Sequence, residues 1–283
     1  MTDVSKPGIL YLCATPIGNL SDITQRVLDT LREVDIIAAE DTRNSIKLLN
    51  HFMINTPLTS YHEYNRYDKA KELIDKLKDG KDIALITDAG TPGISDPGEV
   101  FVKMCLEEGI RVTSLPGACA LITALTISGL GTRRFCFEAF LPSDKKERQE
   151  ILKELKSETR TIIIYEAPHH LKKTLAELKD ALGNRRISLC RELTKQFEEV
   201  LSFTMDQALE YYTVNEPRGE YVLCIEGRDR KELKEEEISS WQDISIKEHM
   251  KLYEEKGLDR MEAMKKVAKD RGISKRDVYN ELI

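Results

Sequence analysis

Long apolar runs and an excess of positive charge are both absent from this chain. Lys and Arg number 43 among the 283 residues, against 49 for Asp and Glu, so the formal net charge is −6. No stretch approaches the roughly 18 apolar residues of a membrane-spanning helix, and residues 1–8 contain no apolar signal region. We therefore expect a cytoplasmic protein with no membrane partner, in which nucleic acid can bind only at a local basic patch.

Cysteine pairs and metal-ligand clusters are lacking as well. The six cysteines include no Cys-x-x-Cys spacing and lie mostly in apolar segments, which is typical of buried thiols in a reducing compartment. His169 and His170 are adjacent, and adjacent side chains point in different directions, so one metal ion would rarely use both. We expect neither a disulfide framework nor a metal site.

The motifs of several common enzyme classes are missing. The chain contains no Walker loop, no Gly-x-Ser-x-Gly elbow and no His-Glu-x-x-His. Residues 129–134, Gly-Leu-Gly-Thr-Arg-Arg, include the first two glycines of a dinucleotide-binding fingerprint but lack the third. ATP-dependent, hydrolytic and nicotinamide-dependent activities are therefore disfavoured.

The chain does contain a regular alternation of short apolar runs and amphipathic segments. Strands are predicted at 9–14, 34–39, 59–61, 83–86 and 111–115, with helices at 21–32, 42–52, 68–77 and 97–108. Ser21 and Asp22 are the candidate caps of the first helix. This order predicts an α/β fold whose first sheet is mostly parallel, with helices on both faces.

A second segment, up to residue 226, shows the same alternation of strands and helices, whereas the segment after it has a different composition. Further strands are predicted at 136–139, 161–165, 187–190, 200–204 and 220–226, with helices at 119–127, 145–156, 171–181 and 205–212. Residues 228–237 are almost wholly charged and predict a solvated linker helix or a disordered tether. We expect an N-terminal α/β domain at 1–117, a second α/β domain at 118–228, and a linker with a helical tail at 229–283.

The tail combines helix caps with a local excess of positive charge. Asp259 and Glu262 have the spacing of a capping box, Gly272 ends that helix, and Ser274 caps the next. The candidate RNA-binding residues are Lys265, Lys266, Lys269, Arg271, Lys275 and Arg276. Helix packing alone would also explain the apolar positions between them, which are Met261, Met264, Val267 and Ala268.

Loops rich in Gly, Pro and Asp follow four of the first strands. The longest, at 88–98, contains three Gly, two Pro and two Asp, and so can be neither helix nor strand. The other three are at 14–20, 39–44 and 114–120. Since the carboxyl ends of parallel strands share one edge, we expect these loops to converge on one ligand-binding cleft. Two loops of the second segment, at 165–170 and 190–195, add polar residues, although Glu192 and Lys195 could simply pair on a helix face.

These loops carry motifs that resemble the tetrapyrrole methylase superfamily, and within it the branch that acts on ribosomal RNA. The resemblance covers about residues 7–227, and the motifs occur in the family's order. They are Leu-Tyr-Leu-Cys-Ala-Thr-Pro-Ile-Gly-Asn-Leu-Ser-Asp-Ile-Thr (10–24), Ala-Glu-Asp-Thr-Arg (39–43), Thr-Asp-Ala-Gly-Thr-Pro-Gly-Ile-Ser-Asp-Pro-Gly (87–98), Pro-Gly-Ala-Cys-Ala (116–120), Tyr-Glu-Ala-Pro (165–168), Arg-Glu-Leu-Thr-Lys (191–195) and Gly-Glu-Tyr-Val (219–222).

The resemblance implies two α/β domains with S-adenosylmethionine folded into the cleft between them, usually in a homodimer. It implies 2′-O-methylation of the ribose of a cytidine in 16S rRNA, with the small ribosomal subunit as partner. By motif, the cofactor-binding residues would be Pro16, Ile17, Asp88, Ala89, Gly90, Gly93, Cys119, Ala120, Glu166 and Leu193. Gly93 stands where the branch often has a larger apolar residue, and Cys119 where it often has Ser or Thr.

A catalytic arrangement can be formulated from the chemistry of methyl transfer. A ribose hydroxyl is a poor nucleophile that gains from a base and from alignment behind the methyl group. We expect Glu40 to act as that base, with Asp41 as the alternative, and Arg43 and Lys195 to position ribose or phosphate. Ion pairing among Glu40, Asp41 and Arg43 is the competing, purely structural interpretation.

Two other functions stay open at this point. A methylase of a tetrapyrrole or corrinoid would share the cleft motifs but would need neither the 39–43 loop nor the basic tail. A ribosome-associated binding protein that has kept the fold would not bind S-adenosylmethionine. Arg133 and Arg134, followed by Phe135, Phe137 and Phe140, could add a second RNA contact, although alternating aromatics on a strand are more often part of a core.

Overall fold

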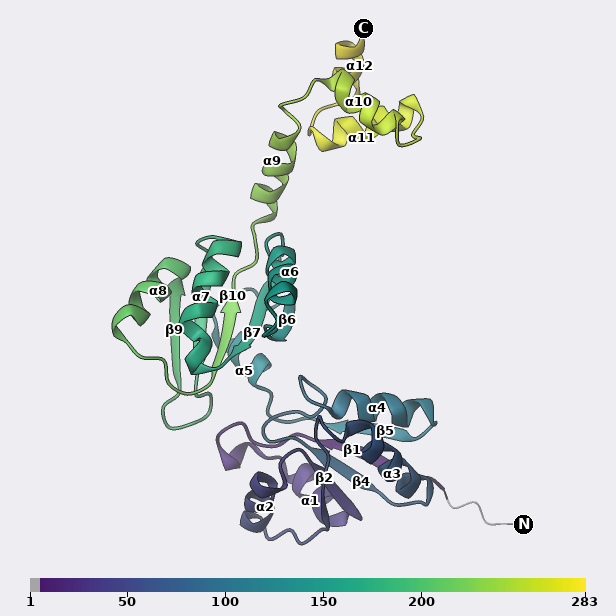
Figure 1. Ribbon diagram of the computed structural model, residues 1–283, viewed down its shortest axis with the longest axis vertical. Coiled ribbons are helices and arrows are strands. Elements are labelled where there is room, and N and C mark those ends of the chain that lie inside the picture. Colours follow the sequence, from purple (N-terminus) through teal and green to yellow (C-terminus); the bar gives the residue numbers. More distant parts are fainter. Residues whose placement is uncertain (1–5) are drawn as a thin grey trace, which may run out of the picture.

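The computed structural model describes residues 6–283, apart from the side chain of residue 237. The expectation that residues 1–8 contain no apolar signal region therefore falls partly on residues 1–5, which lie outside the described residues. Two five-stranded sheets and a helical C-terminal part follow one another along the longest axis of the molecule (Figure 1). The predicted α/β fold with a helical tail is confirmed. Within residues 6–283, no helix is long and apolar enough to cross a membrane.

The first sheet is entirely parallel and has the strand order β3-β2-β4-β1-β5. Its strands are β1 (Ile9–Cys13), β2 (Ile36–Ala39), β3 (Leu58–Ser60), β4 (Ile83–Ile86) and β5 (Arg111–Leu115). Its helices are α1 (Gln25–Glu33), α2 (Thr42–His51), α3 (Arg66–Lys78) and α4 (Gly98–Glu107). The prediction of a mostly parallel first sheet is therefore confirmed.

Helices cover both faces of this sheet, as the four consecutive apolar residues of β4 require. Ile83 and Leu85 pack in a cluster with α3 and α4, whereas Ala84 and Ile86 pack in a second cluster with α1 and α2. Because both faces are buried, the strand has no polar alternation. The central position of β4 then fixes where its following loop, at 87–98, leaves the sheet.

The first helix begins later than expected. Thr24 accepts a hydrogen bond from the Val27 N–H and caps α1, while residues 20–22 form a short 3₁₀ turn capped by Asn19. The prediction of Ser21 or Asp22 as the cap was therefore wrong. Asn19 and Thr24 carry the same kind of side-chain acceptor as Ser21 and Asp22, so composition alone could not choose among the four.

The second sheet has the strand order β6-β7-β10-β8-β9 and is mixed. Only β6 and β7 run parallel, and the other neighbouring pairs are antiparallel. Its strands are β6 (Phe135–Phe140), β7 (Thr161–Glu166), β8 (Arg186–Arg191), β9 (Glu199–Thr204) and β10 (Tyr221–Ile225). Its helices are α5 (Ala120–Ile127), α6 (Lys145–Leu155), α7 (Pro168–Leu182) and α8 (Met205–Val214).

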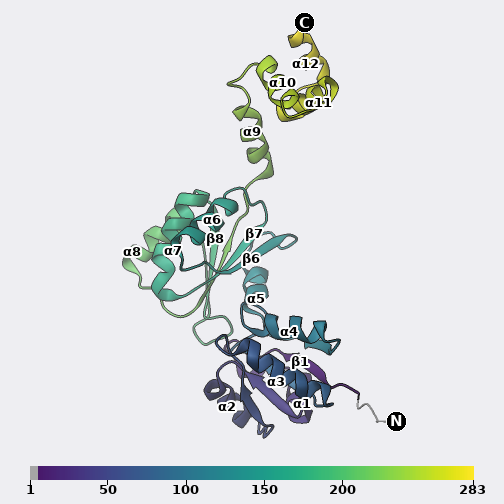
Figure 2. The same cartoon turned by 45° about the vertical axis from the view of Figure 1, so that its right-hand side comes forward.

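Successive side chains of β7 point to opposite faces of this sheet and pack in different core clusters. Ile162 and Ile164 pack in one cluster with α6, α7 and α8, whereas Ile163 packs in another with α5. Helix α5 lies between the two sheets in both views of the molecule (Figures 1 and 2). Its N-terminus therefore comes next to the ends of the first-sheet strands.

The C-terminal part consists of four helices. They are α9 (Arg230–Ser240), α10 (Ile246–Glu254), α11 (Arg260–Asp270) and α12 (Lys275–Leu282). The charged segment 228–237 thus lies largely in a helix, α9, and the last three helices share a core of Met250, Ala263, Met264, Val267, Ala268 and Val278. Met261, which the packing interpretation placed in that core, is 62% exposed. The helical end stands apart from both sheets in the two views (Figure 2).

Candidate functional site: a cavity between the two sheets

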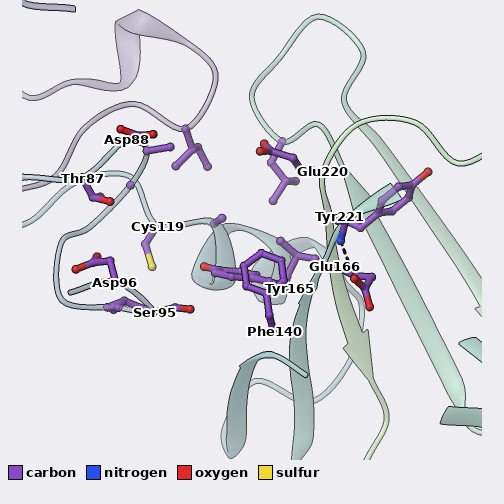
Figure 3. Close-up of a pocket in the computed structure, with 18 of the residues that line it drawn as sticks. Thr87, Asp88, Ser95, Asp96, Cys119, Phe140, Tyr165, Glu166, Glu220 and Tyr221 are labelled. Carbon is purple, nitrogen blue, oxygen red and sulfur yellow. Dashed lines mark hydrogen bonds between the residues drawn. The ribbon is translucent and has the colours of Figure 1, made fainter. Parts of the chain in front are cut away.

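A cavity of about 460 Å³ lies between the two sheets. The loops that follow β2 and β4 and the N-terminus of α5 form one wall, and the ends of β6, β7, β8 and β10 form the other. Thr87, Asp88 and Cys119 lie on one side of it and Glu220 on the other, with Tyr165 and Phe140 between them, whereas the Tyr221 ring points away from it (Figure 3). This volume is within the range of about 300–1,000 Å³ typical of small-molecule sites.

Parallel pairing of β2 and β4 brings Glu40, Thr87 and Asp88 to the same edge of the first sheet. The Thr87 hydroxyl donates a hydrogen bond of 2.8 Å to the Glu40 carboxylate. The Asp88 carboxylate accepts from the Asp41 N–H at 3.2 Å and from the Asn44 side-chain amide at 3.3 Å. Two carboxylates therefore enter this wall with orientations fixed by neighbouring donors.

The loop at 88–98 is held in shape by its own hydrogen bonds. Thr15 and Gly90 exchange two backbone hydrogen bonds, of 2.9 and 3.1 Å, which tie the loop to the segment after β1. Gly90 has φ 89°, a backbone conformation that favours glycine. Asp96 accepts hydrogen bonds from the N–H groups of Gly93 and Gly98. The wall is thus largely pre-formed.

On the opposite wall, Tyr165 and Glu166 have fixed partners. The Tyr165 hydroxyl accepts from the Leu121 N–H at 3.2 Å, and burial raises the pKa of Tyr165 to about 12. The Glu166 side chain is 5% exposed and accepts from the Ala167 N–H and the Thr174 hydroxyl. Its carboxylate therefore stabilises the start of α7.

Lys195 carries the positive charge of the cavity rim. Its ammonium lies 2.9 Å from the Glu192 carboxylate and 3.1 Å from that of Glu220. Burial favours the neutral amine, but the hydrogen bonds to Glu192 and Glu220 outweigh it and raise the pKa of Lys195. The predicted Glu192–Lys195 pair exists, but in a loop where Glu192 and Thr194 have positive φ, and not on a helix.

A contact between the two halves of the molecule restrains the same loop. A Cβ at Gly18 would lie 2.3 Å from Cγ of Lys195 and 2.9 Å from the Leu193 carbonyl oxygen. Gly18 follows β1 in the first half, and Lys195 follows β8 in the second. The absence of a side chain at Gly18 therefore allows the first-sheet loop to lie directly on the Lys195 side chain.

Arg43 does not line the cavity. Its guanidinium lies 2.7 Å from the Asp41 carboxylate, and its side chain is 86% exposed. The Arg43 hydrogen bond lowers the pKa of Asp41 to about 2, which makes Asp41 a poor base. The interpretation of ion pairing among Glu40, Asp41 and Arg43 is therefore confirmed for Asp41 and Arg43 but not for Glu40, which accepts a hydrogen bond from Thr87 instead.

The cavity wall includes most of the residues predicted to bind the cofactor. They are Ile17, Asp88, Ala89, Gly90, Cys119, Ala120, Glu166 and Leu193. Pro16 lies in a neighbouring hollow with Asn44 and His51, and Gly93 lies outside the wall, where its φ of 84° serves the turn. The wall also contains residues that were not predicted to bind, among them Thr91, Ile94, Ser95, Phe140, Tyr165, Glu220 and Tyr221.

The predicted RNA-binding residues lie at the far end of the molecule from the first sheet (Figure 1). Five of them are exposed on α11 and α12, and these are Lys265, Lys266, Lys269, Lys275 and Arg276. Arg271 differs, since its guanidinium donates to His249 Nδ1 and to the Ile244 carbonyl inside the helical part. Among the described residues, no group of three or more His, Cys, Asp or Glu could hold a metal ion.

Comparison with known protein families identifies the fold. The family model "Tetrapyrrole (Corrin/Porphyrin) Methylases" matches residues 9–209, which include both walls of the cavity except β10. The chain belongs to the tetrapyrrole methylase family. Its resemblance to that superfamily, inferred from the loop motifs, is thereby confirmed.

Relatives of this methylase share sequence over nearly its whole length. "Ribosomal RNA small subunit methyltransferase I" of Halalkalibacterium halodurans is 50% identical over 273 residues, which cover 96% of this chain and 94% of that protein. The protein of the same name from Bacillus subtilis is 48% identical over 276 residues, 98% of this chain and 94% of the relative. The one from Escherichia coli O157:H7 is 48% identical over 228 residues, 80% of each.

Solved structures agree with the tetrapyrrole methylase fold at low sequence identity. Diphthine synthase matches with a TM-score of 0.62 at 13% identity, covering 77% of this chain and 90% of that structure. The cobalamin biosynthetic enzyme cobalt precorrin-4 methyltransferase matches with a TM-score of 0.54 at 18% identity, covering 76% and 94%. These structures establish the two-sheet architecture and carry no statement about substrate.

Proposed function

We propose that this chain is an S-adenosylmethionine-dependent methyltransferase that methylates the ribose 2′-oxygen of a cytidine in 16S rRNA. The observation that carries the proposal is the identity of about half of all residues, over nearly the full length, with proteins named ribosomal RNA small subunit methyltransferase I. A shared length of 273 residues includes the helical tail as well as the cavity, so the likeness is not confined to the cofactor site.

The cavity residues fit S-adenosylmethionine. Ile17, Leu193 and Val222 offer apolar walls to a nucleoside, and the Glu40 and Asp88 carboxylates complement a positively charged sulfur. Gly90 has no side chain to separate its backbone from a ligand. When bound, the cofactor supplies an activated methyl group on a sulfonium.

The residues of this chain then have separate roles in the transfer. Glu40 takes the proton of the ribose 2′-hydroxyl, because its carboxylate reaches the cavity and Thr87 holds its orientation. Lys195 contacts ribose or phosphate at the rim, where its ammonium stays charged. Burial between the two sheets excludes water and leaves fixed dipoles around the reacting atoms.

Arg43 belongs to a different part of this scheme. Its exposed guanidinium lies outside the cavity, so it is placed to contact RNA phosphate near the mouth and not the reacting atoms. Pro16 and Gly93 shape the loops around the cofactor without forming its wall.

The proposed partner is the small ribosomal subunit, in the cytoplasm. The exposed basic residues of α11 and α12 support a phosphate-facing surface, since residues 259–277 contain seven Lys and Arg against four Asp and Glu. We further propose that the enzyme works as a homodimer, as the family resemblance implies, and that its domains are 1–117, 118–228 and 229–283, as the changes in pattern along the sequence predict.

The test is transfer of labelled methyl from S-adenosylmethionine to small subunits that lack this modification, followed by nucleoside analysis. A 2′-O-methylated cytidine is the expected product. Cofactor binding without transfer to subunits or to free rRNA would instead favour a methylase of a small tetrapyrrole. Failure to bind the cofactor would favour a non-enzymatic binding protein.

The catalytic assignment has its own test. Glu40→Gln should lower kcat by roughly 10²–10⁴-fold, the usual contribution of a general base. Lys195→Ala should raise KM for the subunit more than it lowers kcat. Unchanged turnover in both variants would remove both residues from the mechanism.

A further inference from the structure

Strand β6 contains an irregularity just before it reaches the cavity. Phe137 pairs with Ile163 and Phe140 with Tyr165, so the register shifts between them and three steps on β6 match two on β7. Ala139 has φ 51°, in the left-handed region that a residue with a side chain rarely adopts. These are the two signs of a β-bulge.

The bulge changes the face on which Phe140 lies. Cys136 packs in the core cluster under α6, and Glu138 has its pKa raised by burial and by Glu154 of that helix. Regular alternation would place Phe140 on this same face. Instead, Phe137 and Phe140 both contact the Tyr165 ring, at centroid distances of 4.9 and 5.7 Å.

The bulge therefore removes a large apolar side chain from a position over the core and turns it into the cavity (Figure 3). Phe140 remains 56% exposed there. Because the Phe140 ring stays in water, the folded state lacks the free energy that burial of this ring would contribute. The positive φ of Ala139 adds backbone strain. Strained backbone that exposes an apolar ring beside a cavity is characteristic of a functional contact.

The position of Phe140 separates it from the inner part of the cavity. Leu193, which lies in the predicted cofactor site, is only 6% exposed, whereas Phe140 lies on the open rim. The Glu220 side chain lies on the same rim, is 83% exposed and forms an ion pair with Lys195. A cofactor in the inner part would leave this rim facing the incoming substrate.

Tyr165 makes the Phe140 ring a supported platform. The two rings meet edge to face at 63°, and the Tyr165 hydroxyl is fixed by the Leu121 N–H. A flat apolar face backed in this way suits an unstacked nucleobase, because RNA-binding proteins commonly stack such bases on aromatic side chains. An enzyme that reacts at one nucleotide must also turn that nucleotide out of its stack.

We propose that Phe140, turned into the cavity by the bulge at Ala139, stacks on the base of the target nucleotide and thereby holds that nucleotide in the cavity. The proposal rests on the proposed function, since it supplies that reaction with a residue that holds the target base. Lys195 on the same rim then contacts the sugar–phosphate of the same nucleotide.

The test compares methyl transfer to small subunits by the full-length enzyme and by F140A, F140L and F140Y. Y67A is the matched control, because Tyr67 on α3 is an aromatic with the same exposed fraction as Phe140, 56%, and does not line the cavity. Three quantities are measured for each protein: kcat, KM for the subunit, and the calorimetric Kd of S-adenosylmethionine. Thermal unfolding is recorded to identify any variant that does not fold.

F140A and F140L should raise KM for the subunit by about tenfold or more, the order expected for removing one base–aromatic stack. F140Y and Y67A should stay near the wild type, and the Kd of S-adenosylmethionine should not change in any variant. A139V should resemble F140A although Phe140 is present, because a β-branched residue cannot hold φ 51° and the bulge would flatten.

A rise in the Kd of S-adenosylmethionine with an unchanged KM for the subunit would show that Phe140 stacks on the cofactor's adenine, and would overturn the proposal. No change in either quantity would also overturn it. A wild-type enzyme that transfers no methyl to subunits overturns the proposed function together with this role. An active wild type with an unchanged F140A overturns the stacking role alone.

Discussion

At the scale of single residues, the chemistry of the cavity depends on partners that hold each polar group. Glu40 reaches the cavity because Thr87 donates to it, and Lys195 keeps its charge because Glu192 and Glu220 surround it. The sequence motifs located Glu40 and Lys195, but not these partners, since a hydrogen bond between residues 40 and 87 depends on the pairing of β2 with β4. Glu166 shows the converse, because its motif is in place but its carboxylate is engaged by Thr174.

The hydrogen bond from Thr87 leads to a prediction about turnover. Thr87→Val keeps the shape of the side chain but removes the donor to the Glu40 carboxylate. A hydrogen bond to a charged group contributes about 1.5–3 kcal/mol, so kcat should fall by about tenfold or more. Thr87→Ser, which restores the hydroxyl, should recover most of the activity. An equal fall in kcat in both variants would point to packing and not to the hydroxyl.

Cys119 offers a chemical probe of the cofactor site. Cys119 and Cys136 are the two partly exposed thiols among the six, and only Cys119 lines the cavity. Burial raises the pKa of Cys136 to about 11, so little of it is thiolate near neutral pH and it should react slowly. Alkylation followed by mass spectrometry should therefore modify Cys119 first.

S-adenosylhomocysteine, the product of methyl transfer, should protect Cys119 from this alkylation. At a concentration of about ten times its Kd, the modification should slow by about tenfold, in proportion to the free fraction. Cys119→Ser should abolish the protected signal, whereas Cys136→Ser should leave it intact. Equal labelling with and without the product would place the cofactor away from Cys119.

At the scale of secondary-structure elements, apolar patterns predicted most strands and helices, because period and length are local properties. β4 and β7 were recognised from their β-branched runs. The bulge in β6 was not, since Phe135, Phe137 and Phe140 show alternation only up to Phe137, and the shift depends on pairing with β7. The antiparallel neighbours of β10 were likewise not visible in the sequence, because strand direction depends on the chain connections.

The last three helices contain a buried histidine with a pH-dependent effect on stability. His249 is fully buried, stacked on Trp241 at 3.8 Å, and faced by Arg271, Asp270 and Tyr253. Burial lowers the pKa of His249, and Arg271 lowers it further, against the opposing effect of Asp270. The folded state therefore holds the neutral imidazole, whereas the unfolded chain binds a proton near pH 6.5.

The free energy of unfolding of this helical part should accordingly decrease as the pH falls from about 7 to about 5. Trp241 is the single tryptophan of the chain, so its fluorescence reports this unfolding selectively. His249→Phe keeps an aromatic ring beside Trp241 and should remove the pH dependence in that range. Stability that falls equally in wild type and variant would assign the effect to other carboxylates.

At the scale of the whole molecule, the structure separates a cavity between two sheets from the exposed Lys and Arg side chains of α11 and α12. Gly227 lies tightly against the Thr159 backbone, and Arg228 donates to the Glu158 carbonyl, so the chain leaves the second sheet at a fixed point. Arg228 is also ion-paired with Glu236, which ties α9 to that exit. Under the proposed function, such an arrangement would let the helical end hold RNA at a distance from the reacting nucleotide.

This separation predicts that the two ends can be altered independently. The triple variant Lys265→Glu, Lys266→Glu and Lys269→Glu changes three exposed side chains of α11 and no residue of the cavity. Its Kd for S-adenosylmethionine should match that of the wild type. Its affinity for the small subunit should fall. The plot of log affinity against log salt concentration should also become less steep, by about 0.7–0.9 for each phosphate that α11 no longer neutralises.

Arg271 and Lys251 provide the controls for that experiment. Arg271→Gln should lower the unfolding temperature of the helical part, because Arg271 donates to His249 and to the Ile244 carbonyl. Lys251→Glu alters an exposed charge on α10, outside the proposed surface, and should leave the salt slope unchanged. Lys251→Glu changes the net charge by −2 and the α11 variant by −6. A loss of binding free energy in Lys251→Glu of about one third of that in the α11 variant would therefore mean that net charge, and not the α11 surface, attracts the RNA. A salt slope that only the α11 variant reduces would place the phosphate contacts on α11.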